Sequence, residues 1–184
     1  MEIEQIRDIL QAKYPDMDAV AIRYEDLVFE ERVRLKCFQC RNYHAKWTCP
    51  GRLPAFDFPR LLGEYVHMAV IICRQQSVVS SLQSAVSSQA SMDGFREAGN
   101  NLHRAMLYLE KELYNRNEPM ATSFIGGSCE LCKDGCNKDA CVHPEQARIP
   151  WDATGCNVAR TLANIGIVVD FAGKEICRYG LLVW

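Results

Sequence analysis

The chain has 184 residues, a length that fits one domain able to bury about 70% of the surface its unfolded form exposes. Its hydrophobic fraction of 48% and charged fraction of 24% are those of an ordinary globular protein. The net charge is −2 and no basic run is longer than a pair. The chain therefore lacks the positive electrostatic potential that would attract nucleic acid or an anionic membrane. We therefore expect a single domain over residues 1–184, with no nucleic acid and no membrane among its partners.

The N-terminal part of the chain predicts one helix and three strands. Amphipathic spacing predicts a helix over Glu2–Lys13. Short β-prone runs predict strands over Ala19–Tyr24 and Val33–Lys36, and an apolar run predicts a buried strand over His67–Ile72.

One long helix dominates the rest of the pattern. Apolar residues that step by three and four predict it over Gly94–Tyr114. Before it, Ser77–Ser91 contains seven serines and fits a helix or a low-complexity loop equally well. After it we expect a short helix and three strands, namely the helix Asn157–Asn164 and the strands Ala121–Ile125, Ile165–Phe171 and Arg178–Trp184. The sum is an α/β (α+β) fold with a small sheet, one long helix and two irregular cysteine-rich loops.

Ten cysteines are the most informative feature of the composition. The first ten residues are acidic and amphipathic, unlike a signal peptide, and the apolar runs Met68–Cys73 and Ile165–Val169 are too short to span a bilayer. We therefore expect a cytoplasmic protein, in a compartment where thiols stay reduced. So many cysteines in such a protein indicate metal or redox chemistry rather than disulfides.

The strongest motif is a group of four thiols within thirteen residues: Cys129, Cys132, Cys136 and Cys141. A cubane [4Fe-4S] cluster needs four thiolates around a small body, so closely spaced ligands on a glycine-rich loop suit it. Zinc is the alternative, although a four-cysteine Zn²⁺ site more often uses two pairs that lie a dozen or more residues apart. We predict an iron–sulfur cluster on these four residues.

A second group has only three cysteines: Cys37, Cys40 and Cys49. Cys156, at an expected helix N-terminus that would lower its thiol pKa, is the best candidate for the fourth ligand. His44 lies inside the loop, whereas the remaining cysteines, Cys73 and Cys177, fit core positions of strands. If a fourth ligand completes this group, the protein has two fully ligated clusters. If no fourth ligand is present, one iron of the second cluster is open to a substrate.

Other side chains near these motifs fit supporting roles or ordinary packing. His143 would be a donor to the cluster or an alternative ligand, and Trp47 and Trp151 would shield metal from water. A further arrangement has the two loops meeting around a single cluster, but seven thiols are more than one cubane uses.

These motifs resemble the predicted metal-binding proteins of anaerobic prokaryotes called domain of unknown function 2284 (DUF2284). The resemblance covers about Val33–Gly166. It rests on the seven grouped cysteines and on the segments Leu109-Glu110, Gly126–Cys132, His143-Pro144, Ala147-Arg148 and Pro150. The family's usual Cys-Pro-Pro is Cys49-Pro50-Gly51 here. Its Gly-Ile-Asp-Val is Gly155-Cys156-Asn157-Val158, so Cys156 is not a family position. The resemblance implies metal binding, with an iron–sulfur cluster as the expected form. It does not imply any particular activity.

Three functions fit the sequence. The first is an iron–sulfur protein with one or two [4Fe-4S] clusters that transfers electrons to a redox partner protein. The second is an enzyme whose three-cysteine cluster presents an open iron to a small-molecule substrate. The third is a binding module stabilised by Zn²⁺. The sequence leaves open whether the protein is an enzyme and how many copies of it associate.

Overall fold

A computed structural model describes residues 1–76, 86–169 and 175–184. Its centre is an antiparallel sheet with the strand order β1-β2-β4-β3. The strands are β1 (Met17–Ala21), β2 (Met68–Gln76), β3 (Thr122–Phe124) and β4 (Glu175–Val183). The helices are α1 (Ile3–Gln11), α2 (Glu31–Phe38), α3 (Phe58–Leu62), α4 (Val86–Tyr114) and α5 (Val158–Asn164), with single 3-10 turns η1 (Tyr24–Asp26) and η2 (Asp152–Thr154). The fold is therefore α+β, as predicted.

Strand β2 contributes side chains to two buried cores, one on each face of the sheet. Its side chains alternate, so that Ala69, Ile71 and Cys73 join one buried cluster while Val70 and Ile72 join the other. This is why its sequence is a continuous apolar run rather than an alternating one.

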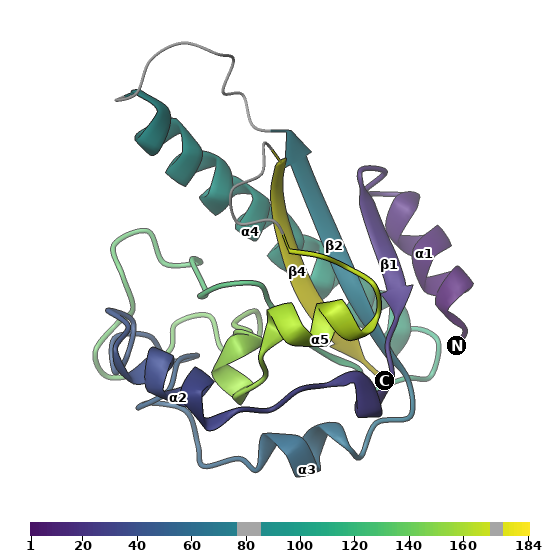
Figure 1. The fold of residues 1–184 in the computed structure, drawn as a ribbon, viewed down its shortest axis with the longest axis horizontal. Helices are drawn as coiled ribbons and strands as arrows, with labels where there is room; N and C mark the ends of the chain where they lie inside the picture. Colours follow the sequence, from purple (N-terminus) through teal and green to yellow (C-terminus); the bar gives the residue numbers. More distant parts are fainter. Residues whose placement is uncertain (77–85, 170–174) are drawn as a thin grey trace.

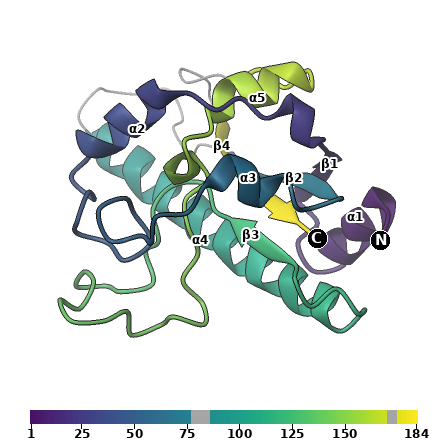
Figure 2. The same ribbon diagram turned by 90° about the horizontal axis from the view of Figure 1, so that it is seen from below.

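Helices and loops cover both faces (Figures 1 and 2). Helices α1 and α4 bury one core, with Ile6, Leu10 and Leu102 fully inaccessible to solvent. Helices α3 and α5 cover the other core, together with the segments that lead into and out of the cysteine-rich loops (Figure 1). Both cysteine-rich loops lie beside α2, at one end of the molecule (Figures 1 and 2).

The expected strand Val33–Lys36 is wrong, because this segment lies within helix α2. No residue of α2 is buried, and Leu35 is 55% exposed, so the short apolar alternation never meets a sheet. Arginine, leucine and lysine are good helix formers. Glu31 in the first turn and Lys36 in the last complement the helix dipole.

The expected strand Ile165–Phe171 is also wrong for the part that the structure describes. Residues 165–169 form the turn that follows α5 and an irregular segment, and residues 170–171 lie outside the described ranges. Ile165, Ile167 and Val169 pack partly against the core, whereas Val168 is 85% exposed. Residues 165–169 alternate like a strand but pair with no strand among the described residues.

The other expected elements are confirmed with shifted ends. Strand β1 begins before Ala19 and ends at Ala21, and Tyr24 starts the turn η1. Helix α4 extends back to Val86, so the serine-rich stretch is helical from there, and residues 77–85 lie outside the described ranges. Among the described residues, no helix combines the length and the apolar character needed to span a membrane.

Candidate metal centre

The two cysteine-rich loops are packed against each other. Lys46 of the first loop donates to the backbone carbonyl of Cys129 at 2.6 Å and forms an ion pair with Glu130 at 2.5 Å. Trp47 donates its indole N–H to the carbonyl of Asn137 at 2.8 Å. The loops therefore form one layer, although more than eighty residues separate Lys46 from Cys129 in the chain.

Backbone hydrogen bonds close the second loop at its base. The amide of Ile125 donates to Ile149 at 3.0 Å, and the amide of Trp151 donates back to Ile125 at 2.8 Å. The chain approaches β4 so closely at Gly126 that an added Cβ would lie 2.4 Å from the carbonyl oxygen of Tyr179. Only glycine fits there, so the glycine pair before Cys129 fixes where the loop leaves the sheet.

Helix α4 holds the far side of the second loop. Arg148 forms a two-pronged ion pair with Glu110 of α4, with one N···O distance of 2.7 Å, and Ser123 also donates to Glu110. The Arg148 and Glu110 side chains are only 18% and 11% exposed. The Nε2 atom of His103 in α4 lies 2.8 Å from the carbonyl oxygen of Gln146. A neutral imidazole with its proton on Nε2 donates this hydrogen bond.

The four cysteines of the second loop line one cavity. Its volume is about 20 Å³, and Lys46, Thr48 and His143 also line it. The structure thus brings together Cys129, Cys132, Cys136 and Cys141, as the spacing predicts. We call this hollow the four-cysteine cavity.

The donor set of this cavity suits a sulfur-rich anionic group. The hydroxyl of Thr48 is buried and has no hydrogen-bond partner among the described residues. An unpaired buried donor costs free energy unless something accepts from it, and inorganic sulfide or thiolate sulfur would do so. The Lys46 ammonium adds a positive charge beside Cys129, while burial is the main cause that raises the pKa of that thiol.

The three cysteines of the first loop line a separate cavity with a volume of about 70 Å³. Cys37 lies in the last turn of α2, and Cys40 and Cys49 follow on tight turns. Ser128 and Asp152 also line the cavity, and both come from distant parts of the chain. We call it the three-cysteine cavity.

Burial keeps two of these thiols protonated in the absence of a cation. It raises the pKa of Cys37 to about 11, and the nearby Asp152 carboxylate adds to this shift. Burial likewise raises the pKa of Cys49 to about 12, against a lowering by the Lys46 ammonium. Because metal ligands must be thiolates, a bound metal would release these protons, and its affinity would rise with pH.

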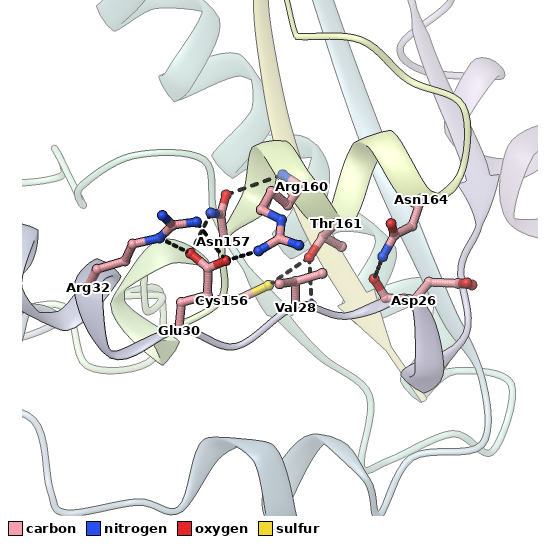
Figure 3. A network of polar contacts seen from close by, with 9 residues as sticks. All are labelled: Asp26, Val28, Glu30, Arg32, Cys156, Asn157, Arg160, Thr161 and Asn164. Atoms are coloured by element: carbon pink, nitrogen blue, oxygen red, sulfur yellow. Dashed lines mark hydrogen bonds and ion pairs between the residues drawn. The ribbon is translucent and has the colours of Figure 1, made fainter.

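A polar network around Glu30 positions α2 and therefore Cys37 (Figure 3). The Glu30 carboxylate accepts from Arg32 at 2.5 Å, from Asn157 at 2.8 Å and from Arg160. Hydrogen bonds from Arg32, Asn157 and Arg160 lower the pKa of Glu30 to about 2. The start of α2 is thus attached to the start of α5.

Cys156 belongs to this network rather than to the three-cysteine cavity. Its side chain is fully buried, and its Sγ lies 3.2 Å from the Thr161 hydroxyl, which accepts from the Val28 amide (Figure 3). It lines a neighbouring hollow and is not among the residues that line the three-cysteine cavity. The structure does not bring it to the other three thiols.

Three further candidates, Cys73, Cys177 and His44, also lie outside both cysteine cavities, whereas Trp47 and His143 line the four-cysteine cavity. Cys73 is buried in strand β2 and Cys177 is half-buried in β4, the core-strand positions expected for them. His44 is exposed, with its ring against Gly51. Within the described residues, no three His, Cys, Asp or Glu side chains converge tightly enough to hold a single metal ion as the structure stands.

The sequence analysis missed three residues at the two cavities. Thr48 and Lys46 lie inside the first loop but line the four-cysteine cavity, and Asp152 comes from η2. No ligand-like spacing marks any of them, and only the packing of the two loops reveals them.

A small α+β scaffold that carries two cysteine-lined cavities on paired loops defines a class of metal-binding protein. The chain belongs to the family described as predicted metal-binding protein (DUF2284), which matches residues 20–183. No curated protein and no solved structure matches the chain.

Proposed function

We propose that the chain is a cytoplasmic iron–sulfur protein that holds two clusters and transfers single electrons to a partner protein. The observation that carries this proposal is the pair of neighbouring cysteine-lined cavities, one with four thiols and one with three. Cys129, Cys132, Cys136 and Cys141 would hold one cluster, and Cys37, Cys40 and Cys49 would hold the other.

The separation of the thiols favours a cluster over zinc. A Zn–S bond of about 2.3 Å brings the four sulfurs of a tetrahedral site within about 4 Å of one another. An iron–sulfur cluster instead keeps its thiolates farther apart, with iron and sulfide between them. Within the described residues, no three potential ligands converge tightly enough for a single ion, and the unpaired Thr48 hydroxyl would donate to cluster sulfur.

The closeness of the cavities supports electron transfer. A bound cluster supplies one-electron oxidation and reduction, and the protein supplies position and surroundings. Ser128 lines the three-cysteine cavity and the adjacent Cys129 lines the four-cysteine cavity. Cys40 is exposed, and the exposed aromatic rings of Phe38 and Phe56 line a wide groove beside it that a partner would cover.

The same groove favours one second candidate function, an enzyme with an open iron. Tyr43 and Pro50 line both the groove and the three-cysteine cavity, so a small molecule in the groove would reach the cavity. Spectral change on adding small thiols or carboxylates would distinguish this function from pure electron transfer.

The proposal is tested by anaerobic reductive titration followed by electron paramagnetic resonance (EPR). We expect the protein to take up about two electrons per chain, one for each cluster, and to release them reversibly. Cys132→Ser should remove one of the two signals and Cys40→Ser the other. A colourless protein that accepts no electrons and contains zinc would contradict the proposal.

A further inference from the structure

We infer that Asp152 is the fourth ligand of the metal site formed by Cys37, Cys40 and Cys49. The inference rests on the proposed iron–sulfur function and specifies the part of it that the cysteines leave incomplete. Asp152 lines the same cavity as Cys37, Cys40 and Cys49.

The fold holds Asp152 in this place independently of any metal. Trp151, which precedes it, is 1% exposed and is hydrogen-bonded to Ile125 at the base of the second loop. The turn η2 begins at Asp152 and ends at Thr154, and the following Gly155 has a φ of +86°, the left-handed conformation that glycine adopts without strain. Turn η2 packs against α2, which carries Cys37.

Asp152 takes part in none of the ion pairs that the described residues form. The residue is exposed, and its own backbone amide and that of Ala153 donate hydrogen bonds to its carboxylate. The carboxylate therefore has no ion-paired cation to lose when it binds a metal.

The other donors at the cavity fit less well. Asn42, Tyr43 and Ser128 also line it, but their side chains are neutral at physiological pH and are weaker ligands than a carboxylate. Cys156, the sequence candidate, is buried against Thr161 and is not among the lining residues. Among the described residues that line the cavity, Asp152 alone besides the cysteines can supply an anionic side chain.

A carboxylate ligand has a chemical consequence. Oxygen binds iron less tightly in a sulfur-rich cluster than thiolate does, so the iron beside Asp152 would be the most easily lost or exchanged. The three-cysteine cluster would thus be the more oxidant-sensitive of the two.

The test uses holoprotein purified without oxygen, with the variants Asp152→Asn, Asp152→Cys and, as a control, Asp8→Asn on the exposed face of α1. Iron and sulfide are counted before and after one equivalent of ferricyanide per cluster, and EPR detects three-iron clusters. In that oxidation ferricyanide accepts one electron, one iron(II) ion leaves, and a three-iron cluster remains. The intact four-cysteine cluster in each variant shows that the chain has folded.

We expect about eight irons in the wild type and in Asp8→Asn, and about seven in Asp152→Asn before oxidation, with the three-iron signal of Asp152→Asn appearing once ferricyanide has oxidised its cluster. Asp152→Cys should keep about eight irons and resist ferricyanide better than the wild type. If Asp152→Asn keeps all its iron and gives no three-iron signal, the inference is overturned while the proposed function stands. A wild type without iron would instead overturn the proposed function.

Discussion

Thr48 and Cys49 are neighbours in the chain but line different cavities. Thr48 lines the four-cysteine cavity, whereas Cys49 lines the three-cysteine cavity. Both residues are buried, so consecutive residues of the first loop contribute to two sites. The wall between the cavities is therefore only a few residues thick, and each loop contributes to both.

The unpaired hydroxyl of Thr48 predicts a specific effect on the four-cysteine cluster. Thr48→Val removes a donor to cluster sulfur, and such donors stabilise the more negative, reduced state. We expect the reduction potential of that cluster to fall while its iron content is unchanged. Thr48→Ser, which keeps the hydroxyl, is the matched control. Equal potentials in the wild type and Thr48→Val, measured by EPR-monitored titration, would show that Thr48 does not donate to the cluster.

Cys156 should be dispensable for metal binding. Cys156→Ala removes a buried Sγ that contacts Thr161, so we expect a loss of about 1–2 kcal/mol in the free energy of unfolding. Iron and sulfide content should stay at the wild-type level, in contrast to Cys37→Ala. Loss of about half the iron in well-folded Cys156→Ala would make Cys156 a ligand.

The Arg148–Glu110 pair should behave as a coupled unit. Arg148→Met leaves the mostly buried Glu110 carboxylate without its cation, at a cost on the order of 3 kcal/mol. The double variant Arg148→Met/Glu110→Gln should recover part of that loss, because no unpaired charge remains. A urea-denaturation double-mutant cycle measures the coupling, and additive effects would contradict it.

His103 predicts a pH dependence of stability. Burial lowers its pKa below the ordinary value of 6.5, and the unfolded chain then binds the proton more readily than the folded one. The contribution of His103 is therefore fully present above about pH 6.5 and is lost as the pH falls toward the folded-state pKa. Thermal unfolding from pH 8 to pH 5 should show this decrease, and His103→Gln should lessen it. An identical pH profile in His103→Gln would contradict the assignment.

The sequence predicted those features that depend on local pattern. The spacing of Cys129, Cys132, Cys136 and Cys141 anticipated thiols around one cavity, and the apolar steps of α4 anticipated the long helix. The pattern failed at Val33–Lys36, because four alternating residues cannot show whether a partner strand exists. The role of Asp152 could not be predicted for another reason. Asp152 comes close to the first loop through the packing of η2 on α2, which the sequence pattern does not show.

The measurement that tests the central claim most directly is the content of iron, acid-labile sulfide and zinc in protein purified without oxygen. Two clusters on the two loops predict about eight irons, about eight sulfides and no stoichiometric zinc, with the broad visible absorption of iron–sulfur proteins. One or two zinc ions in a colourless protein, with neither iron nor sulfide, would contradict the account.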